Sequence, residues 1–310
     1  YTERLFQRRR IQLRSGCLLG IYHPNRAMDI PNIDAVSLIG CVDRCLEKLN
    51  TCSDYSSFYT LMEQEIQKEV NAIYEKHRNL YIIPSPMMSL LMDGTIERAK
   101  DISEGSYYNN YGIHGTGIAT ATDTLAALKK YYFEEQSLDY TTLLTAIRSN
   151  FKGYEELQKI KRRSAKMGQD NDYADLIAKD LLDSFDRSLA DKRNERGGVY
   201  RAGTGTAMYY IFHSNQLRAT PDGRNNGEMI PANYSPSLFL KQKGPISVIK
   251  SFTKQHLDRV VNGGPLTLEF DQTVFSNDET IEKLGMLVKT YIVLGGHQLQ
   301  LNTVSRETLL

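Results

Sequence analysis

Apolar residues recur every three or four positions in several stretches of the chain, which is the spacing of one helix face. The expected helices cover residues 33–49, 58–77, 87–99, 122–130, 141–148 and 172–189. The last is the clearest, because one apolar stripe steps through it by four: Tyr173, Ile177, Leu181, Phe185 and Leu189. Three aspartates lie off this stripe and are expected to face solvent: Asp175, Asp180 and Asp183.

The last eighty residues follow a strand–helix–strand pattern. Apolar and polar residues alternate over 266–270 and again over 298–304, which predicts two strands. Ser276 and Glu279 open the helix between them, and Gly295-Gly296 closes it. Its inward-facing side chains are expected to be Ile281, Leu284, Val288 and Tyr291. A third strand-like segment covers 199–212, and we expect all three strands to lie in one curved sheet with the helices outside.

The final strand carries different side chains on its two sides. Leu299 and Leu301 belong to one side, whereas three amide-bearing residues belong to the other: Gln298, Gln300 and Asn302. Such a strand suits a barrel wall whose lumen contains chemistry.

The composition is that of an ordinary globular chain. Its 310 residues are 41% hydrophobic and 24% charged, with a formal charge of +1, so the chain can bury a sizeable core. No apolar run approaches the roughly 18 residues that span a bilayer, and the first residues lack the apolar core of a signal peptide. We therefore expect a cytoplasmic protein without membrane contact. The triplet Arg8-Arg9-Arg10 is interpreted as solvated surface or a partner contact, and no nucleic-acid site is expected.

All four cysteines lie in the first sixth of the chain: Cys17, Cys41, Cys45 and Cys52. Cys41 and Cys45 are four residues apart and share a face of the expected helix. Two thiols make an incomplete metal site, and no later cysteine completes one, so no metal is predicted. We interpret these residues as small buried hydrophobes rather than as metal ligands or a disulfide.

A glycine-rich stretch, residues 112–117, precedes the expected helix 122–130. Glycines ahead of a helix can expose backbone amides to a phosphate. Thr120 stands where the dinucleotide fingerprint has a third glycine or alanine, so nucleotide binding is retained only as a minor alternative. Thr120 and Asp123 are expected to cap the start of the helix.

Three short motifs of the chain resemble those of one family. The loop around Cys17 has a Gly-Cys pair, residues 219–224 read Ala-Thr-Pro-Asp-Gly-Arg, and residues 298–302 read Gln-Leu-Gln-Leu-Asn before a Ser-Arg-Glu-Thr-Leu-Leu continuation. They resemble the glycyl radical enzymes, the pyruvate formate-lyase-like superfamily, and within it the dehydratase, decarboxylase and choline-lyase branch. The resemblance implies an α/β fold that is part of a ten-stranded barrel with many outer helices. The turn at 219–224 is interpreted as scaffold rather than as catalytic residues.

The resemblance also predicts a domain organisation. Residues 1–310 would be a partial barrel domain, with the family's N-terminal half barrel and its C-terminal glycine radical domain absent. No Arg-Val-(Ser/Thr)-Gly motif, on which the family stores its radical, occurs in the 310 residues. We therefore expect a fragment that is inactive alone.

The family mechanism assigns Cys17 the catalytic role. A partner activase, with an iron–sulfur cluster and S-adenosylmethionine, would generate a glycyl radical on a residue outside this chain. That radical would take hydrogen from Cys17, whose thiyl would take hydrogen from a small substrate and lead to C–C, C–O or C–N cleavage, by a lyase or a formate acetyltransferase-like enzyme. The resemblance implies a homodimer for the full-length protein. Substrate contacts are expected from Asp29 and Asn32, and from the amides Gln298, Gln300 and Asn302.

One position departs from the family pattern. Eliminating members carry Gly-Cys-x-Glu, in which the glutamate acts as a base, whereas this chain has Leu19 there. The base could come from elsewhere, the chemistry could need none, or activity could have been lost. A catalytically silent binding or structural paralogue and an unrelated α/β nucleotide-binding protein are the alternative hypotheses.

Overall fold

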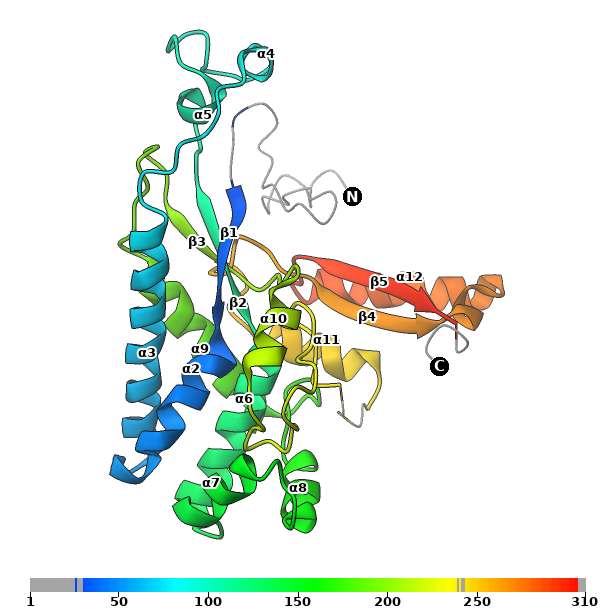
Figure 1. Cartoon of the computed structure of the whole chain (residues 1–310). Helices are drawn as coiled ribbons and strands as arrows, with labels where there is room; N and C mark the ends of the chain where they lie inside the picture. Colours follow the sequence, from blue (N-terminus) through cyan, green and yellow to red (C-terminus); the bar gives the residue numbers. More distant parts are fainter. Residues whose placement is uncertain (1–25, 27–29, 239, 241–242, 306–310) are drawn as a thin grey trace.

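The structure is a computed structural model, and it describes residues 26, 30–238, 240 and 243–305 (Figure 1). Its strands are β1 (Ile30–Ser37), β2 (Tyr111–Thr116), β3 (Tyr200–Gly203), β4 (Leu266–Asp271) and β5 (Leu299–Val304). Its helices are α2 (Leu38–Cys45), η1 (Leu46–Thr51), α3 (Tyr55–Lys76), α4 (Pro86–Ser89), α5 (Ile102–Gly105), α6 (Ile118–Ala127), η2 (Leu128–Glu134), α7 (Tyr140–Arg148), α8 (Glu155–Arg162), α9 (Asp172–Leu189), α10 (Tyr209–Gln216), α11 (Pro245–Thr253), η3 (Gln272–Phe275) and α12 (Asp278–Val293).

Strands β1, β2 and β3 form a parallel sheet with β2 in the middle. Helices α2, α3, α6 and α9 pack together on one side of it (Figure 1). Gly115 of β2 faces these helices, because a Cβ added there would lie 2.9 Å from Leu38 and 3.1 Å from Phe185. Side chains alternate along a strand, so Tyr111 and Ile113 share this helix-covered face.

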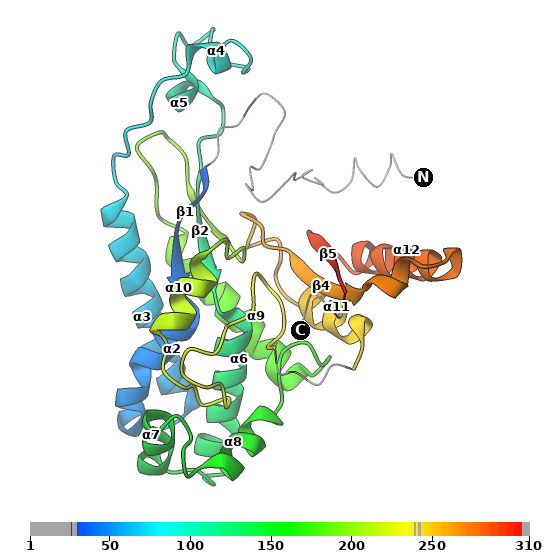
Figure 2. The ribbon, with the colours of Figure 1, turned by 45° about the vertical axis from the view of Figure 1, so that its right-hand side comes forward.

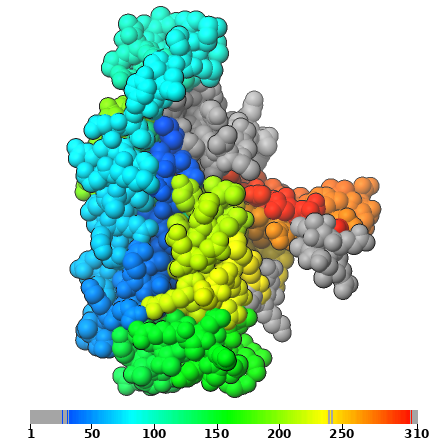
Figure 3. Space-filling model, in the orientation of Figure 1, coloured from blue at the N-terminus to red at the C-terminus, as the bar shows by residue number. Residues whose placement is uncertain are grey.

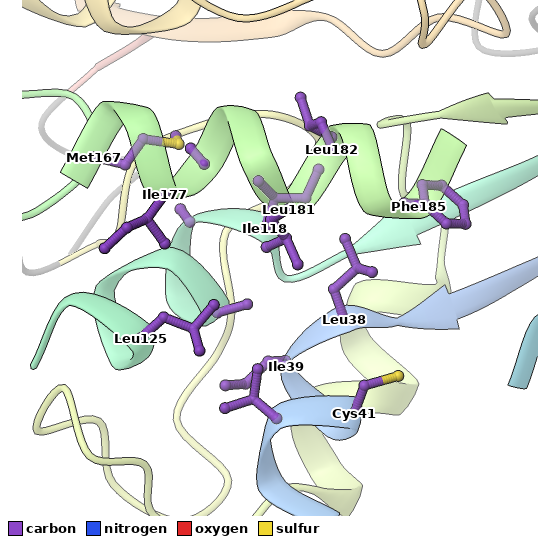
Figure 4. Close-up of a cluster of buried hydrophobic side chains, with 14 of the residues drawn as sticks. Leu38, Ile39, Cys41, Ile118, Leu125, Met167, Ile177, Leu181, Leu182 and Phe185 are labelled. Carbon is purple, nitrogen blue, oxygen red and sulfur yellow. The ribbon is translucent and has the colours of Figure 1, made fainter. Parts of the chain in front are cut away.

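Local signals explain the two longest helices. Asp54 and Ser57 form a capping box at the start of α3, and the Asn171 side chain accepts a hydrogen bond from Tyr173 N at the start of α9. The apolar stripe of α9 is buried from Ile177 to Leu189, which confirms the predicted helix. Figure 4 shows α9 packing Leu181 and Phe185 toward side chains of α2 and α6.

Strands β4 and β5 form a second parallel sheet, and α12 connects them. These elements lie together at one side of the molecule in both ribbon views (Figures 1 and 2). This confirms the predicted strand–helix–strand unit, although the burial of α12 differs in part. Leu287 and Tyr291 are buried, whereas Ile281 is exposed.

The prediction that all three strands lie in one curved sheet is wrong for the described residues, because β3 and the β4–β5 pair belong to separate hydrogen-bonded sheets. Two backbone hydrogen bonds connect them: Asn262 N donates to Ala202 O at 3.0 Å, and Thr204 N donates to Gly263 O at 2.6 Å. Beyond them the chain turns through Gly264, whose φ of 141° and 1.9 Å approach of an added Cβ to Thr204 Oγ1 require glycine. The fold class still holds, since the chain mixes helices with parallel strands.

Three predicted elements differ from the structure. Residues 30–37 form β1, so the helix expected over 33–49 begins only at Leu38. The strand expected over 199–212 ends at Gly203, and the chain becomes helical again in α10. Residues 87–99 hold only the end of α4 followed by turns. In the space-filling view the segment with α4 and α5 forms a lobe at one end of the molecule (Figure 3). Among the helices of the described ranges, none is long and apolar enough to cross a membrane.

Candidate functional site

The candidate site is the inner face of the three-stranded sheet, defined as the side opposite Gly115 and the covering helices. On β2 it consists of Gly112, His114 and Thr116, which alternate with the helix-facing residues. The β3 register places Arg201 and Gly203 beside them on the same face. This face therefore carries polar groups, whereas Ile113 and Gly115 on the other face of β2 pack against the helices.

His114 occupies space that Gly203 leaves vacant. A Cβ added to Gly203 would lie 2.7 Å from His114 Nδ1 and 3.0 Å from Asn262 Nδ2. His114 is buried, so its imidazole is part of a packed polar layer on the inner face. Any larger residue at position 203 would displace it.

Thr116 contacts α10 at the carboxyl end of β2. Its Oγ1 lies 2.6 Å from His213 Nδ1 and 3.3 Å from the Val36 carbonyl oxygen, to which it donates. Burial lowers the pKa of His213 below its usual value. The imidazole is therefore mostly neutral at neutral pH and able to accept a proton.

Asn32 lies where the β1–β2 register shifts. Ile30 pairs with Tyr111, but Asp34 pairs with Ile113, so β1 contains two extra residues between these pairs. Such irregularities re-aim side chains and are common next to active sites. Asn32 Oδ1 is buried and accepts no hydrogen bond from the described residues. A buried amide oxygen without a donor is costly unless a ligand or water supplies one.

The three amides predicted on the last strand have different environments. Gln298 Oε1 accepts a hydrogen bond from Gly264 N at 3.1 Å, so this side chain holds the corner before β4. Gln300 Nε2 donates to Asn302 Oδ1 at 3.1 Å, which confirms that these two lie on one side of β5. Leu299 and Leu301 pack against the core instead. The structure thus brings together Gln300 and Asn302, while Asn32 belongs to the other sheet.

Cys17 and Asp29 lie outside the described residues, so their predicted roles stay predictions. Of the other cysteines, Cys41 and Cys45 lie on α2 and are buried as predicted, whereas Cys52 lies just after η1 and is only half-buried, contrary to that prediction. Burial raises the pKa of Cys41, and it raises the pKa of Cys45 to about 12. Neither thiol is therefore poised as a thiolate nucleophile. Among the described residues no group of three histidine, cysteine or acidic side chains could hold a metal ion.

The turn at residues 219–224 is buried and charged, a feature that the sequence did not reveal. Lys166 Nζ lies 3.7 Å from Asp123 Oδ2 and 3.9 Å from Asp222 Oδ2, and all three side chains are buried. Thr220 Oγ1 donates to Asp222 at 2.6 Å within the turn. The Arg224 guanidinium is buried as well and donates to the carbonyl oxygens of Arg218 and Ser214. The turn is thus an internal anchor, in keeping with the predicted scaffold role.

Two expectations for acidic residues are corrected here. Asp123 does not cap α6, because it is buried and accepts hydrogen bonds from Met167 N and Ser237 Oγ. Asp175 and Asp183 do not face solvent either, while Asp180 does. Asp175 pairs with Lys254 at 3.0 Å and Asp183 with His256 at 2.9 Å. Their partners come from residues 254–259, far away in sequence, which a local helical pattern does not predict.

The start of α6 is packed rather than open. Gly117 has a φ of 69° and caps the helix, and a Cβ added there would lie 2.6 Å from Ile39 Cγ2. Ile118 and Ala119 of the first turn are buried. A phosphate has no room at these amides, so the geometry removes the basis of the nucleotide-binding alternative.

These elements define an α/β protein whose parallel strands carry polar groups on one face. One family model, described as Pyruvate formate lyase-like, matches residues 46–212, and a second, described as Glycine radical, matches residues 231–310. The chain belongs to the pyruvate formate lyase-like family of glycyl radical enzymes. The resemblance predicted from sequence is therefore confirmed, and the unrelated nucleotide-binding alternative is wrong.

Individual relatives agree with this assignment. The trans-4-hydroxy-L-proline dehydratase of Clostridioides difficile is 32% identical over 253 residues, which cover 79% of this chain and 31% of that protein. The probable dehydratase YbiW of Escherichia coli is 31% identical over 264 residues, covering 82% of this chain and 32% of that protein. The chain therefore spans about a third of the length of the curated relatives it matches.

Solved structures share the fold. Hydroxyproline dehydratase from C. difficile, with trans-4-hydroxy-L-proline bound, superposes with a TM-score of 0.85 at 25% identity over 96% of this chain and 40% of that one. The B12-independent glycerol dehydratase of Clostridium butyricum gives a TM-score of 0.85 at 23% identity, over 92% of this chain and 39% of that one.

Proposed function

We propose that the whole protein containing this chain is a glycyl radical lyase that removes a small leaving group from a hydroxylated substrate. The observation that carries the proposal is the partnerless Oδ1 of Asn32 on the irregular β1, in a chain of this family. The dehydratases named above support the reaction type, and so does an isethionate sulfite-lyase of Bilophila wadsworthia that is 30% identical over 200 residues. Among C–C, C–O and C–N bonds, the dehydratases favour C–O.

The chemistry would begin at Cys17. Its thiyl, formed by hydrogen transfer to the glycyl radical, would take a hydrogen atom from the substrate carbon next to the leaving group. Hydrogen-atom transfer is short-range, so the substrate has to be held against the sulfur. A donor on the substrate, such as a hydroxyl or an ammonium, would bind Asn32 Oδ1. Gln300 and Asn302, together with Asp29, are the further substrate contacts in this proposal.

The remaining parts of the machinery belong to the whole protein. The radical would reside on a glycine outside this chain and would be installed by a radical S-adenosylmethionine iron–sulfur activase. Residues 1–310 would form part of the ten-stranded barrel, and the N-terminal half barrel and the radical-bearing loop would come from the rest of the protein. We further propose that the whole protein is a cytoplasmic homodimer that works under anaerobic conditions.

Leu19 favours a second candidate function. The family glutamate at this position would place a proton acceptor beside the substrate carbon, and leucine cannot do so. A paralogue that binds a small molecule without converting it would retain Asn32 and lack turnover. The two candidates differ in whether the activated protein consumes substrate.

The test uses the complete protein, activated without oxygen. Electron paramagnetic resonance should detect a glycyl radical in wild type and in Cys17→Ser, whereas only wild type should turn over a panel of trans-4-hydroxy-L-proline, glycerol, propane-1,2-diol and isethionate. Serine blocks the relay because its O–H bond is too strong for radical transfer. A radical without turnover in wild type would favour the silent paralogue. Equal turnover in Cys17→Ser would remove Cys17 from the mechanism.

A further inference from the structure

A polar cavity lies on the helix-covered side of the sheet, on the opposite side from the inner face. It has a volume of about 180 Å³ and is lined mainly by the end of α3 and the loop before β3: Tyr74, Arg78, Asn79, Arg193, Asn194, Glu195 and Tyr200. Tyr200 pairs with Tyr111 in the β2–β3 register and contacts the Tyr74 ring at 5.3 Å. This cavity is therefore separated from the inner face by the sheet itself.

A partnerless hydroxyl belongs to this cavity. Tyr200 is 4% exposed, and its hydroxyl is buried without a hydrogen-bond partner in the described structure. Burial raises the pKa of Tyr200 to about 12, so the hydroxyl remains a donor at neutral pH. Leaving such a group unsatisfied is costly, which favours a ligand that accepts its proton.

The charged residues that line the cavity are Arg78, Arg193 and Glu195, and Arg78 is already paired with Glu75 at 3.1 Å. The Glu195 carboxylate already has partners, because it accepts hydrogen bonds from the Tyr111 hydroxyl and from Asn79 N. Arg193 uses one nitrogen for the carbonyl oxygens of Ala190 and Lys192, and no carboxylate of the described residues lies within salt-bridge distance of it. The Lys192 ammonium lies over the Tyr74 ring at 4.9 Å and donates to a neutral amide oxygen. Arginine with donors to spare is the preferred side chain for oxyanions.

The loop that carries these groups is held in shape before any ligand arrives. Asn194 Oδ1 accepts hydrogen bonds from Arg196 N and Gly198 N, and its Nδ2 donates to Asn109 O at 2.7 Å. Gly198 lies so near Asn109 that an added Cβ would be 2.0 Å from its carbonyl oxygen. A preorganised loop loses little entropy on binding, which favours affinity.

We propose that this cavity binds a small oxyanion of the phosphate or carboxylate type, with the Arg193 guanidinium as the charged donor and the Tyr200 hydroxyl as the donor at its floor. The volume accommodates an anion of about five non-hydrogen atoms. The site is distinct from the inner face that carries His114 and Thr116, because the sheet separates them. Its occupant would act as an effector that ties the end of α3 to the start of β3.

The experiment needs no radical and is therefore independent of the proposed catalytic function. The complete protein, not activated, is titrated calorimetrically with inorganic phosphate and separately with acetate in constant 150 mM sodium chloride. Arg193→Gln should weaken binding by about tenfold or more, and Tyr200→Phe by about fivefold, since each removes one hydrogen bond to a charged ligand. Arg148→Gln is the matched control, because it removes one positive charge from an exposed arginine that pairs with Glu47 at 2.8 Å.

The two anions distinguish the sources of the ligand. Saturable binding of phosphate or acetate that is lost in the two cavity variants and kept in Arg148→Gln would support the site, and the tighter anion would identify its class. Linear, unsaturable heats for both anions would overturn the proposal. Equal weakening in Arg148→Gln would overturn it too, because it would mean general charge attraction. Circular dichroism of each variant verifies that a lost signal does not reflect unfolding.

Discussion

Lys166 Nζ lies 3.7 Å from the Asp123 carboxylate, and both side chains are fully enclosed. Asp123 comes from α6, and Lys166 comes from the loop between α8 and α9. Asp222 of the buried turn meets the same ammonium at 3.9 Å. One lysine thus connects three segments that are distant in sequence.

We expect Lys166→Met to destabilise the protein by about 3–5 kcal/mol, because it leaves two carboxylates buried without their counter-charge. Urea unfolding of the complete protein, followed by circular dichroism, measures the change. Lys159→Met is the control, since Lys159 is exposed and pairs with Glu156 on the surface of α8, and it should change the free energy of unfolding by less than about 1 kcal/mol. Similar losses in both variants would contradict an anchoring role for Lys166.

The stability contribution of Asp123 should fall as pH rises. Burial raises its pKa to about 6, above the ordinary value of 3.8, so the folded state binds the proton more tightly than the unfolded state. The stabilisation is complete below pH 4 and is lost as pH rises to about 6, by on the order of 2–3 kcal/mol. Unfolding free energies between pH 4 and 7 should therefore decline in wild type relative to Asp123→Asn. A constant difference between the two proteins would refute this titration.

Asn32→Leu should separate stability from substrate binding. Asn32 Oδ1 has no donor in the described structure, so its replacement by an apolar residue of similar size should change the free energy of unfolding by less than about 1 kcal/mol, or raise it. In the activated complete protein the same change should raise KM by about tenfold. Asn302→Leu, at another of the proposed substrate contacts, should raise KM as well. A large loss of stability with unchanged KM would show that Asn32 is structural.

Gly264→Ala should be severely destabilising, by about 3 kcal/mol or more, because the new Cβ would meet Thr204 Oγ1 at 1.9 Å and φ is 141°. Gly285→Ala is a matched control within α12, where an added Cβ meets nothing within 4 Å. That change should stabilise the protein by about 0.5–1 kcal/mol, as alanine usually does inside a helix. Thermal unfolding of both variants checks the contrast, and a tolerated Gly264→Ala would mean that the two sheets can separate at this corner.

Hydrophobic periodicity predicts the bounds of an element well where the segment carries a regular apolar stripe and its own cap. α9 extends from Asp172 to Leu189, as predicted, because its apolar stripe is regular and Asn171 caps it. β1 was hidden because it runs directly into α2, so apolar residues of strand and helix together imitate one helical period. The end of β3 at Gly203 depends on its neighbour Asn262, which local sequence cannot indicate.

The sequence predicts which residue types belong to the candidate site, but not which partners their side chains contact. The alternation over 298–302 correctly places Gln300 and Asn302 on one side of the strand. It cannot show that Gln298 Oε1 accepts a hydrogen bond from Gly264 N. The buried charges at Asp123 and Asp222 were missed, because their shared partner Lys166 lies in another segment. A Pro-Asp-Gly turn looks exposed by composition, and only the packing around it shows otherwise.

The register of the two sheets has a consequence for the order of folding. β4 and β5 pair across about 30 residues, whereas Ile30 pairs with Tyr111, and Tyr111 with Tyr200, each across about 80–90 residues. On a ribosome, β1 emerges before β2 exists, and the edge that pairs with β2 remains unpaired until then. The β4–α12–β5 unit has no such delay. The segment that carries Asn32 therefore waits longer for its pairing strand than β4 does for β5, and it has more need of protection during that interval.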